Sequence, residues 1–108
     1  MPYLGCYKDA SKRDLTDWLK DNTTPAECFK LARDKNYEFV GIQVGHQCWG
    51  SQRVGIYGNV PDSECKFDTK DKGLKGGSTF RNSVWFTGTQ TFKKHSNYCV
   101  NAGGKDLK

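Results

Sequence analysis

Hydrophobic and polar positions follow a helical period after residue 24, where the chain carries a strong helix-start signal. Thr24 can cap a helix, Pro25 suits the first helical position, and Glu27 completes a capping box with Thr24. From there to about Lys35, the apolar side chains fall on one face and the charged side chains on the other. The apolar face carries Cys28, Leu31 and Ala32. We therefore predict a single amphipathic helix that packs against a sheet.

Alternation of β-favouring positions predicts that sheet. The clearest run, residues 37–44, is rich in β-branched and aromatic side chains, and both of its faces are expected to be partly covered. Gly45 and His46 separate it from a second run, which suits a hairpin. The expected strands are residues 3–7, 37–44, 47–51 and 79–86, and the expected loops are residues 16–23 and 55–77. The predicted fold class is α+β, with one main helix packed on a small twisted antiparallel sheet.

The size of the chain limits it to one compact core. It has 108 residues, of which 35% are hydrophobic and 13% aromatic, and a domain of this size gains much from cross-links. We assign residues 1–88 to one domain and residues 89–108 to a C-terminal extension or the start of a following segment. No apolar run is long enough for a membrane span, so none is expected.

Cysteine usage favours disulfides. The five cysteines, at positions 6, 28, 48, 65 and 99, are spaced too widely for a zinc ribbon or finger. Disulfides indicate a secreted or extracellular protein, and we expect that a leader has been removed or that the chain is part of a larger secreted protein. Four cysteines permit three pairings, and the odd count leaves one thiol that stays reduced or bonds to another chain or to a missing segment. The Asn22-Thr23-Thr24 sequon makes Asn22 a candidate glycosylation site.

Charge and catalytic motifs exclude several function classes. The formal net charge is +5, but the lysines are scattered, so we expect no nucleic-acid groove. His46 and His95 lack the motifs that would give either imidazole a catalytic partner. Gly76-Gly77 lacks the lysine and hydroxyl of a phosphate-binding loop. We therefore expect no enzyme activity, no metal site and no cofactor.

Short motifs spread in order over residues 3–85 carry a family resemblance. They are Tyr3-Leu4-Gly5-Cys6-Tyr7, Thr24-Pro25-Ala26-Glu27-Cys28, Phe39-Val40-Gly41-Ile42-Gln43, Cys48-Trp49, Tyr57-Gly58, Ser63-Glu64-Cys65, Gly76-Gly77 and Arg81-Asn82-Ser83-Val84. Together they resemble the WSC domain, a cysteine-rich extracellular module found in cell-wall sensors, in Kremen-type receptors and attached to wall-acting enzymes. The resemblance implies an apple/PAN-like, disulfide-stapled form.

The resemblance also implies a cysteine pairing. The fuller family pattern has eight cysteines, and this chain has lost four of them, at Ala32, at Gly50, near Asp68 and at Lys75. Loss of a disulfide should remove both partners, so we group Ala32 with Gly50 and Asp68 with Lys75. The pairs that remain are Cys6 with Cys65 and Cys28 with Cys48. Cys99 is left over as the candidate for an intermolecular disulfide.

The function implied is noncatalytic, lectin-like binding of a cell-wall or matrix polysaccharide or a glycoprotein glycan. Aromatic rings pack against the C–H groups of a sugar while amide and guanidinium groups bind its hydroxyls. The candidate ligand-binding residues are Trp18, Gln43, Trp49, Tyr57, Arg81, Asn82 and Trp85. Trp49 is also expected to cover the disulfide beside it, and Arg13 is expected to form an internal ion pair with Asp9. The alternative is a protein-interaction or structural module of a receptor or extracellular assembly, linked to itself or to a partner through Cys99.

Overall fold

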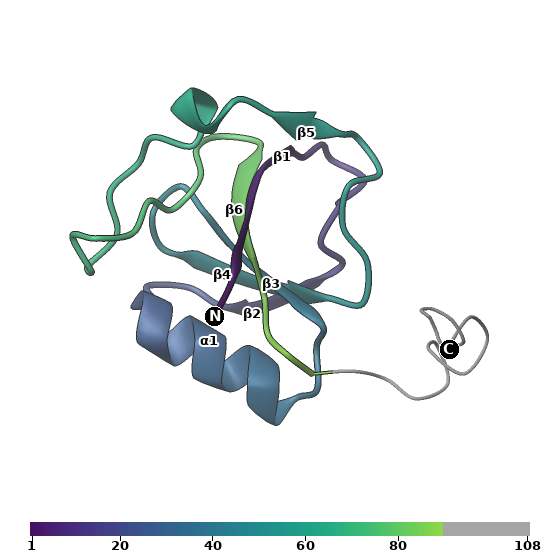
Figure 1. The fold of residues 1–108 in the computed structure, drawn as a ribbon, viewed down its shortest axis with the longest axis vertical. Helices are drawn as coiled ribbons and strands as arrows, with labels where there is room; N and C mark the ends of the chain where they lie inside the picture. The colour runs from purple at the N-terminus through teal and green to yellow at the C-terminus, as the bar shows by residue number, and fades with distance from the viewer. Residues whose placement is uncertain (90–108) are drawn as a thin grey trace.

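The computed structural model describes residues 1–89, which form one sheet with one main helix. The elements are β1 (Tyr3–Lys8), β2 (Asp17–Lys20), α1 (Pro25–Asp34), β3 (Phe39–Gln43), β4 (Gln47–Ser51), β5 (Asn59–Val60), the 3-10 helix η1 (Asp62–Glu64) and β6 (Arg81–Phe86). The strands lie in the order β2-β4-β3-β6-β1-β5, and all neighbouring pairs are antiparallel. Helix α1 lies along one face of the sheet (Figure 1), so the predicted α+β class is confirmed. Within these residues, no helix has the length and apolar character needed to cross a bilayer.

Helix α1 begins where the capping signal predicts. The Thr24 hydroxyl accepts a hydrogen bond from the Glu27 N–H at 3.1 Å, and the Glu27 carboxylate accepts one from the Thr24 N–H at 3.0 Å. These two bonds satisfy helix N–H groups that have no partner inside the helix. The helix ends at Asp34, one residue before the predicted limit.

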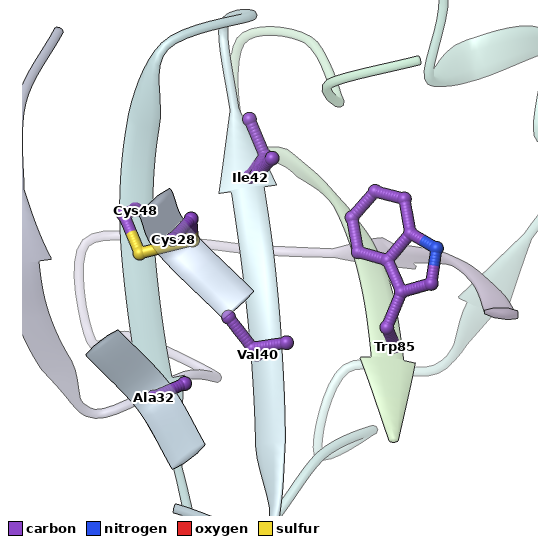
Figure 2. Close-up of a cluster of buried hydrophobic side chains, with 6 residues drawn as sticks. All are labelled: Cys28, Ala32, Val40, Ile42, Cys48 and Trp85. Carbon is purple, nitrogen blue, oxygen red and sulfur yellow. A yellow bond between two sulfur atoms is a disulfide. The ribbon is translucent and has the colours of Figure 1, made fainter. Parts of the chain in front are cut away.

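The first core lies between α1 and the sheet, on what we call the helix face. Figure 2 shows its buried side chains: Cys28, Ala32, Val40, Ile42, Cys48 and Trp85. Leu19 and Tyr37 are partly buried against this cluster. Cys28 and Cys48 form a disulfide that joins α1 to β4.

The second core lies on the opposite side, which we call the loop face. Leu15, Trp49 and Val84 are buried there, with Val54 partly buried against them. Gly41 permits this packing, because a Cβ at that position would lie 2.3 Å from Leu15 Cδ1. Neighbouring residues of a strand point to opposite faces, so the prediction that Trp49 covers the disulfide of Cys48 is wrong.

Two predicted loops contain regular structure. Residues 17–20 form strand β2 because they pair with β4, with Trp18 opposite Trp49. This strand lies at one edge of the sheet. Within the predicted loop 55–77, strand β5 pairs with β1, and η1 follows it. The four longer strands lie within the predicted runs or extend them by one residue.

The structure also bears on the cysteine pairing that the resemblance implies. Besides Cys28 with Cys48, it pairs Cys6 with Cys65, which are 59 residues apart, as the resemblance implied. Asp68 and Lys75 face each other across an antiparallel bridge, and Lys75 Nζ lies 2.6 Å from Asp68 Oδ1. An ion pair therefore joins two of the positions that the resemblance pairs. Cys99 and all of the expected extension except Thr89 lie outside the described residues.

Candidate functional site

The candidate site is a row of three aromatic rings and one guanidinium group on the loop face, which we call the aromatic row. Its members are Trp18, Trp49, Arg13 and Phe80. Trp18 and Trp49 are register partners on β2 and β4, and their rings stack with centroids 6.1 Å apart and planes 22° apart. Within the row, Trp49 is buried, whereas Trp18 is 59% exposed. The outer tryptophan therefore presents an aromatic surface to solvent.

Arg13 continues the row beyond Trp49. Its guanidinium carbon lies 4.8 Å from the centre of the Trp49 ring and 5.5 Å from the centre of the Phe80 ring. A cation at these distances is attracted to the electron-rich ring faces. Nη1 also bonds Asp9 Oδ2 at 2.7 Å, which confirms the expected internal ion pair.

Asp9 anchors the arginine from below. The carboxylate is buried, and besides Arg13 it accepts hydrogen bonds from the Asp14 N–H and from Gln43 Nε2, each at 2.9 Å. Burial acts to raise the pKa of Asp9, but the hydrogen bonds from Asp14, Arg13 and Gln43 outweigh it and hold the pKa below its ordinary value. Asp9 is therefore a buried anion that fixes the position of Arg13.

Phe80 reaches the row from an unusual backbone conformation. Its φ is 53°, in the left-handed region that a residue with a bulky side chain seldom adopts. The Phe80 N–H donates to Gln43 Oε1 at 3.0 Å, and the Phe80 carbonyl accepts from the Asp9 N–H at 2.9 Å. Gln43 and Asp9 therefore fix the positions of both Arg13 and Phe80. Strain of this kind persists only where surrounding contacts determine it, and it clusters at functional sites.

Two of the predicted ligand-binding residues support the row without reaching the surface. Gln43 and Asn82 are register partners on β3 and β6, and both are buried. Gln43 Nε2 donates to Asn82 Oδ1 at 3.3 Å, and Asn82 Nδ2 has no hydrogen-bond partner among residues 1–89. Their place in the structure indicates a positioning role beneath the row.

Tyr57 lies beside the row in a covering loop. It is half-buried, and its hydroxyl donates to the carbonyl of Lys12, the residue before Arg13. This bond ties the two loops that cover the loop face.

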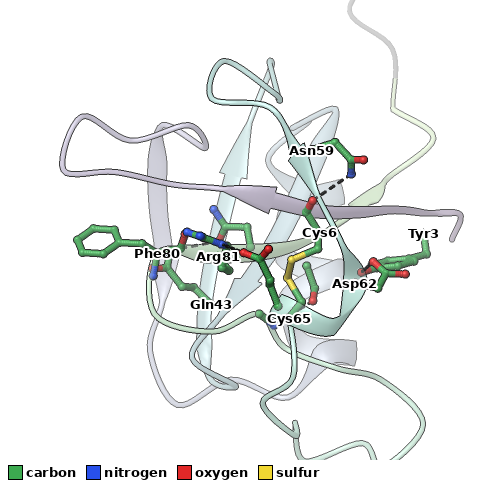
Figure 3. Close-up of a disulfide and its surroundings, with 12 residues drawn as sticks. Tyr3, Cys6, Gln43, Asn59, Asp62, Cys65, Phe80 and Arg81 are labelled. Atoms are coloured by element: carbon green, nitrogen blue, oxygen red, sulfur yellow. Dashed lines mark hydrogen bonds and ion pairs between the residues drawn. A yellow bond between two sulfur atoms is a disulfide. The ribbon is translucent and has the colours of Figure 1, made fainter.

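The other two predicted residues, Trp85 and Arg81, lie on the helix face. Trp85 is 3% exposed and contacts the rings of Tyr3 and Phe29, with centroid distances of 5.3 and 4.9 Å. Arg81 Nε bonds Glu64 Oε1 at 2.7 Å, next to the Cys6–Cys65 bridge (Figure 3). The structure thus brings together only part of the predicted set.

Sequence reasoning missed Arg13 and Phe80 as members of the site. Arg13 carried a signal, because a basic residue four positions after Asp9 suggested an ion pair, but its aromatic neighbours, Trp49 and Phe80, come from distant parts of the chain. Phe80 carried none, since its positive φ depends on Gln43 and Asp9. Asn22, the candidate glycosylation site, is exposed in the turn before α1. No group of side chains able to hold a metal ion occurs in the part of the chain described.

The sequence is similar to known proteins over most of the described residues. The family model of the WSC domain matches residues 3–77, more than half of the chain. A Drosophila melanogaster protein named Xylosyltransferase oxt is 33% identical over 67 residues. That match covers 57% of this chain but only 8% of the fly protein. The similarity therefore concerns a small part of that relative.

Proposed function

We propose a noncatalytic carbohydrate-binding function from one premise: the chain belongs to the WSC domain family. The observation that carries the proposal is the exposure of the Trp18 ring, 59%, at the end of a row that also contains Arg13. Contact with a ligand or partner would remove this aromatic surface from water, which is favourable. A secreted or extracellular protein with a polysaccharide or glycan as its partner fits this arrangement and the two disulfides.

The row can recognise a sugar through two kinds of contact. The C–H face of a pyranose packs against the flat Trp18 ring, which removes apolar surface from water. Arg13 supplies N–H donors for the hydroxyl groups, since a guanidinium carries five donors and its side chain is 35% exposed. Asp9 holds the arginine in place, so little side-chain freedom is lost when a ligand binds.

The name of the similar fly protein is consistent with a carbohydrate ligand. The fly protein is named as a xylosyltransferase. A domain that binds a glycan would suit a protein with such an activity. The row itself offers no pair of acid and base groups in solvent, because Asp9 is buried and bound to Arg13. Its role in the proposal is to hold a glycan and leave it unchanged.

Binding to insoluble β-glucan, xylan and chitin tests the proposal. We expect wild-type protein to be retained on at least one of them, and Trp18→Ala to weaken that retention about tenfold or more. Phe67→Ala is the matched control, because Phe67 is also an exposed aromatic residue, 40% exposed, but lies outside the row. Equal retention of the two variants, or no retention of wild type on any polysaccharide, would refute the role of the row.

The second candidate function is a protein-interaction or structural module. It is favoured by one observation: the other four cysteines of residues 1–108 bond to each other, so Cys99 has no cysteine partner left within this sequence. The same exposed rings would then form the centre of a contact with another chain.

A further inference from the structure

A second candidate site, a pocket, lies on the helix face, on the opposite side of the sheet from the aromatic row. It is a pocket of about 270 Å³ beside the Cys6–Cys65 bridge. Tyr3 of β1 and Trp85 of β6 contribute to its lining, together with Leu74 and Lys75 from the loop before β6 and Asp62 of η1. Figure 3 shows Tyr3 and Asp62 next to the bridge. The disulfide joins β1 to the segment that follows η1, so it fixes two walls of the pocket relative to each other.

The apolar part of the pocket is an angled pair of rings. Tyr3 and Trp85 are register partners, and their ring planes meet at 54° with centroids 5.3 Å apart. Tyr3 is 44% exposed, although it lies against the buried Trp85. The Tyr3 ring, completed by Leu74, can contact one side of a small ring, while the buried Trp85 lies behind it in the pocket lining.

The polar part of the pocket carries one negative and one positive side chain. Asp62 Oδ1 accepts a hydrogen bond from the Tyr3 hydroxyl at 3.0 Å. Burial and this hydrogen bond raise the pKa of Tyr3 to about 12, so the phenol stays a donor to Asp62. Lys75 is more than half exposed and forms its ion pair with Asp68 outside the pocket lining. Opposite charges of equal size favour a neutral polar ligand over an ion.

The size of the pocket limits its ligand further. Its volume lies just below the range of roughly 300 to 1,000 Å³ that is usual for drug-sized ligands. We propose that this pocket binds a single neutral sugar residue, with its C–H face against the exposed ring of Tyr3 and its hydroxyls toward Asp62 and Lys75. The inference rests on the proposed function for the class of ligand, but it concerns different residues on the other face of the sheet. A ligand in the pocket therefore leaves the aromatic row free.

The three tryptophan indole N–H signals can report the two sites separately. We would titrate the ¹⁵N-labelled full chain with methyl β-glucoside, methyl β-xyloside and the methyl β-glycoside of N-acetylglucosamine. Trp18→Phe and Trp49→Phe each remove one signal, so the remaining one belongs to Trp85 without any change in the pocket. We expect the Trp85 signal to shift along a saturable curve with at least one of these sugars.

Substitutions at Tyr3 test whether that shift comes from the pocket. Tyr3→Ala removes one wall and should weaken the interaction about tenfold, whereas Tyr3→Phe keeps the ring and should change it less than threefold. Leu4→Ala is the matched control, because Leu4 is the neighbouring exposed residue of β1 and does not line the pocket. If Tyr3→Ala loses its dispersed spectrum, Asp62→Ala takes its place, since Asp62 is exposed.

The outcomes separate the pocket from the proposed function. A shift of Trp18 alone overturns the pocket and leaves the aromatic row supported. A shift of Trp85 alone supports the pocket and contradicts the row. No shift of either signal with any of the three sugars overturns the pocket, and so does a Trp85 shift that Tyr3→Ala or its substitute Asp62→Ala leaves unchanged.

Discussion

Asp9 is the residue on which the aromatic row depends most. It is 3% exposed, yet it carries a charge, and its oxygens bind Arg13, Gln43 and the Asp14 N–H. A buried carboxylate is stable only when such partners replace water. One side chain therefore couples the stability of the first loop to the position of the guanidinium group.

Asp9→Asn should lower the free energy of unfolding by about 2 to 3 kcal/mol at neutral pH, because charge-assisted hydrogen bonds are lost and Arg13 is left without its partner. Urea denaturation followed by fluorescence measures the change. The matched control is Asp34→Asn. Asp34 and Lys30 form a pair in which both side chains are more than half exposed, so its loss should cost less than about 0.5 kcal/mol.

The effect of Asp9 should also depend on pH. Its pKa is lower in the folded protein than in the unfolded chain, so its stabilisation is complete above the unfolded value of about 4 and is lost as pH falls through the folded value. The difference between wild type and Asp9→Asn should therefore shrink below about pH 4. A difference that stays constant down to about pH 2 would contradict the assignment of Asp9 as a buried anion.

Elements differ in how much of their position the sequence predicts. Helix α1 was predicted to within one residue, because Thr24, Pro25 and Glu27 form a local signal. Strand β2 was missed, since its four residues lie in a polar stretch and become a strand only by pairing with β4. The two-residue β5 depends in the same way on β1. Local chemistry predicts elements that carry their own signals, whereas edge strands depend on distant partners.

The candidate site follows the same rule. Trp18 and Trp49 were identified from the sequence as candidate ligand-binding residues, and the structure stacks them. Their grouping with Arg13 and Phe80 needs contacts from three separate parts of the chain. Gln43 and Asn82 were identified for their amides, but sequence alone gave no means of predicting their burial at the centre of the sheet.

A prediction at the scale of elements concerns the disulfide that the WSC resemblance implies at the positions of Asp68 and Lys75. These residues are bridge partners beside the Gly76 N–H to Phe67 carbonyl hydrogen bond, and opposed strand positions have Cα atoms close enough for a disulfide. Asp68→Cys with Lys75→Cys should form a bond that raises stability by about 2 kcal/mol when oxidised, relative to the reduced variant. Chemical denaturation with and without a reductant measures this difference.

The second lost pair supplies the contrast. A Cβ at Gly50 would lie 2.7 Å from Cδ2 of Tyr37 and 2.9 Å from Cδ1 of Leu19, so these side chains fill the place of the missing bridge. Ala32→Cys with Gly50→Cys should therefore form a disulfide less completely and lower the stability of the fold. Equal stabilisation by the two engineered pairs would show that Tyr37 and Leu19 do not oppose the second bond.

The whole molecule is held by two covalent links of different reach. The Cys28–Cys48 bridge closes 20 residues and joins helix to sheet, whereas the Cys6–Cys65 bridge closes 59 residues and joins β1 to the long loop before β6. On the chain-entropy model these links contribute roughly 3 and 4 kcal/mol. For a domain of this size, such contributions are comparable to the whole free energy of folding. Each bridge lies near one of the two proposed binding sites. Cys48 of the first bridge is the neighbour of Trp49 on β4, and its side chain points to the opposite face of the sheet. Cys65 of the second bridge lines the pocket.

Cys99 extends the argument from one molecule to two. With the other four cysteines bonded in pairs, an oxidising environment leaves its thiol free to bond to a second chain. We expect nonreducing electrophoresis to show a dimer for the wild type and a monomer for Cys99→Ser, with a reductant converting the former to the latter. Mass mapping of the dimer should still find Cys6 bonded to Cys65 and Cys28 to Cys48. A wild type that runs as a monomer would contradict covalent assembly.

The dimer and the carbohydrate proposal can be tested against each other. Two linked copies present two aromatic rows, and linking weak sites raises retention on a polysaccharide without any new contact. If the wild type forms the dimer, it should be retained more strongly than Cys99→Ser on the same insoluble glucan, xylan or chitin, while a soluble monosaccharide glycoside should bind both equally. A dimer with no gain on any polysaccharide would favour the structural or protein-binding alternative, because covalent pairing would then serve assembly and not avidity.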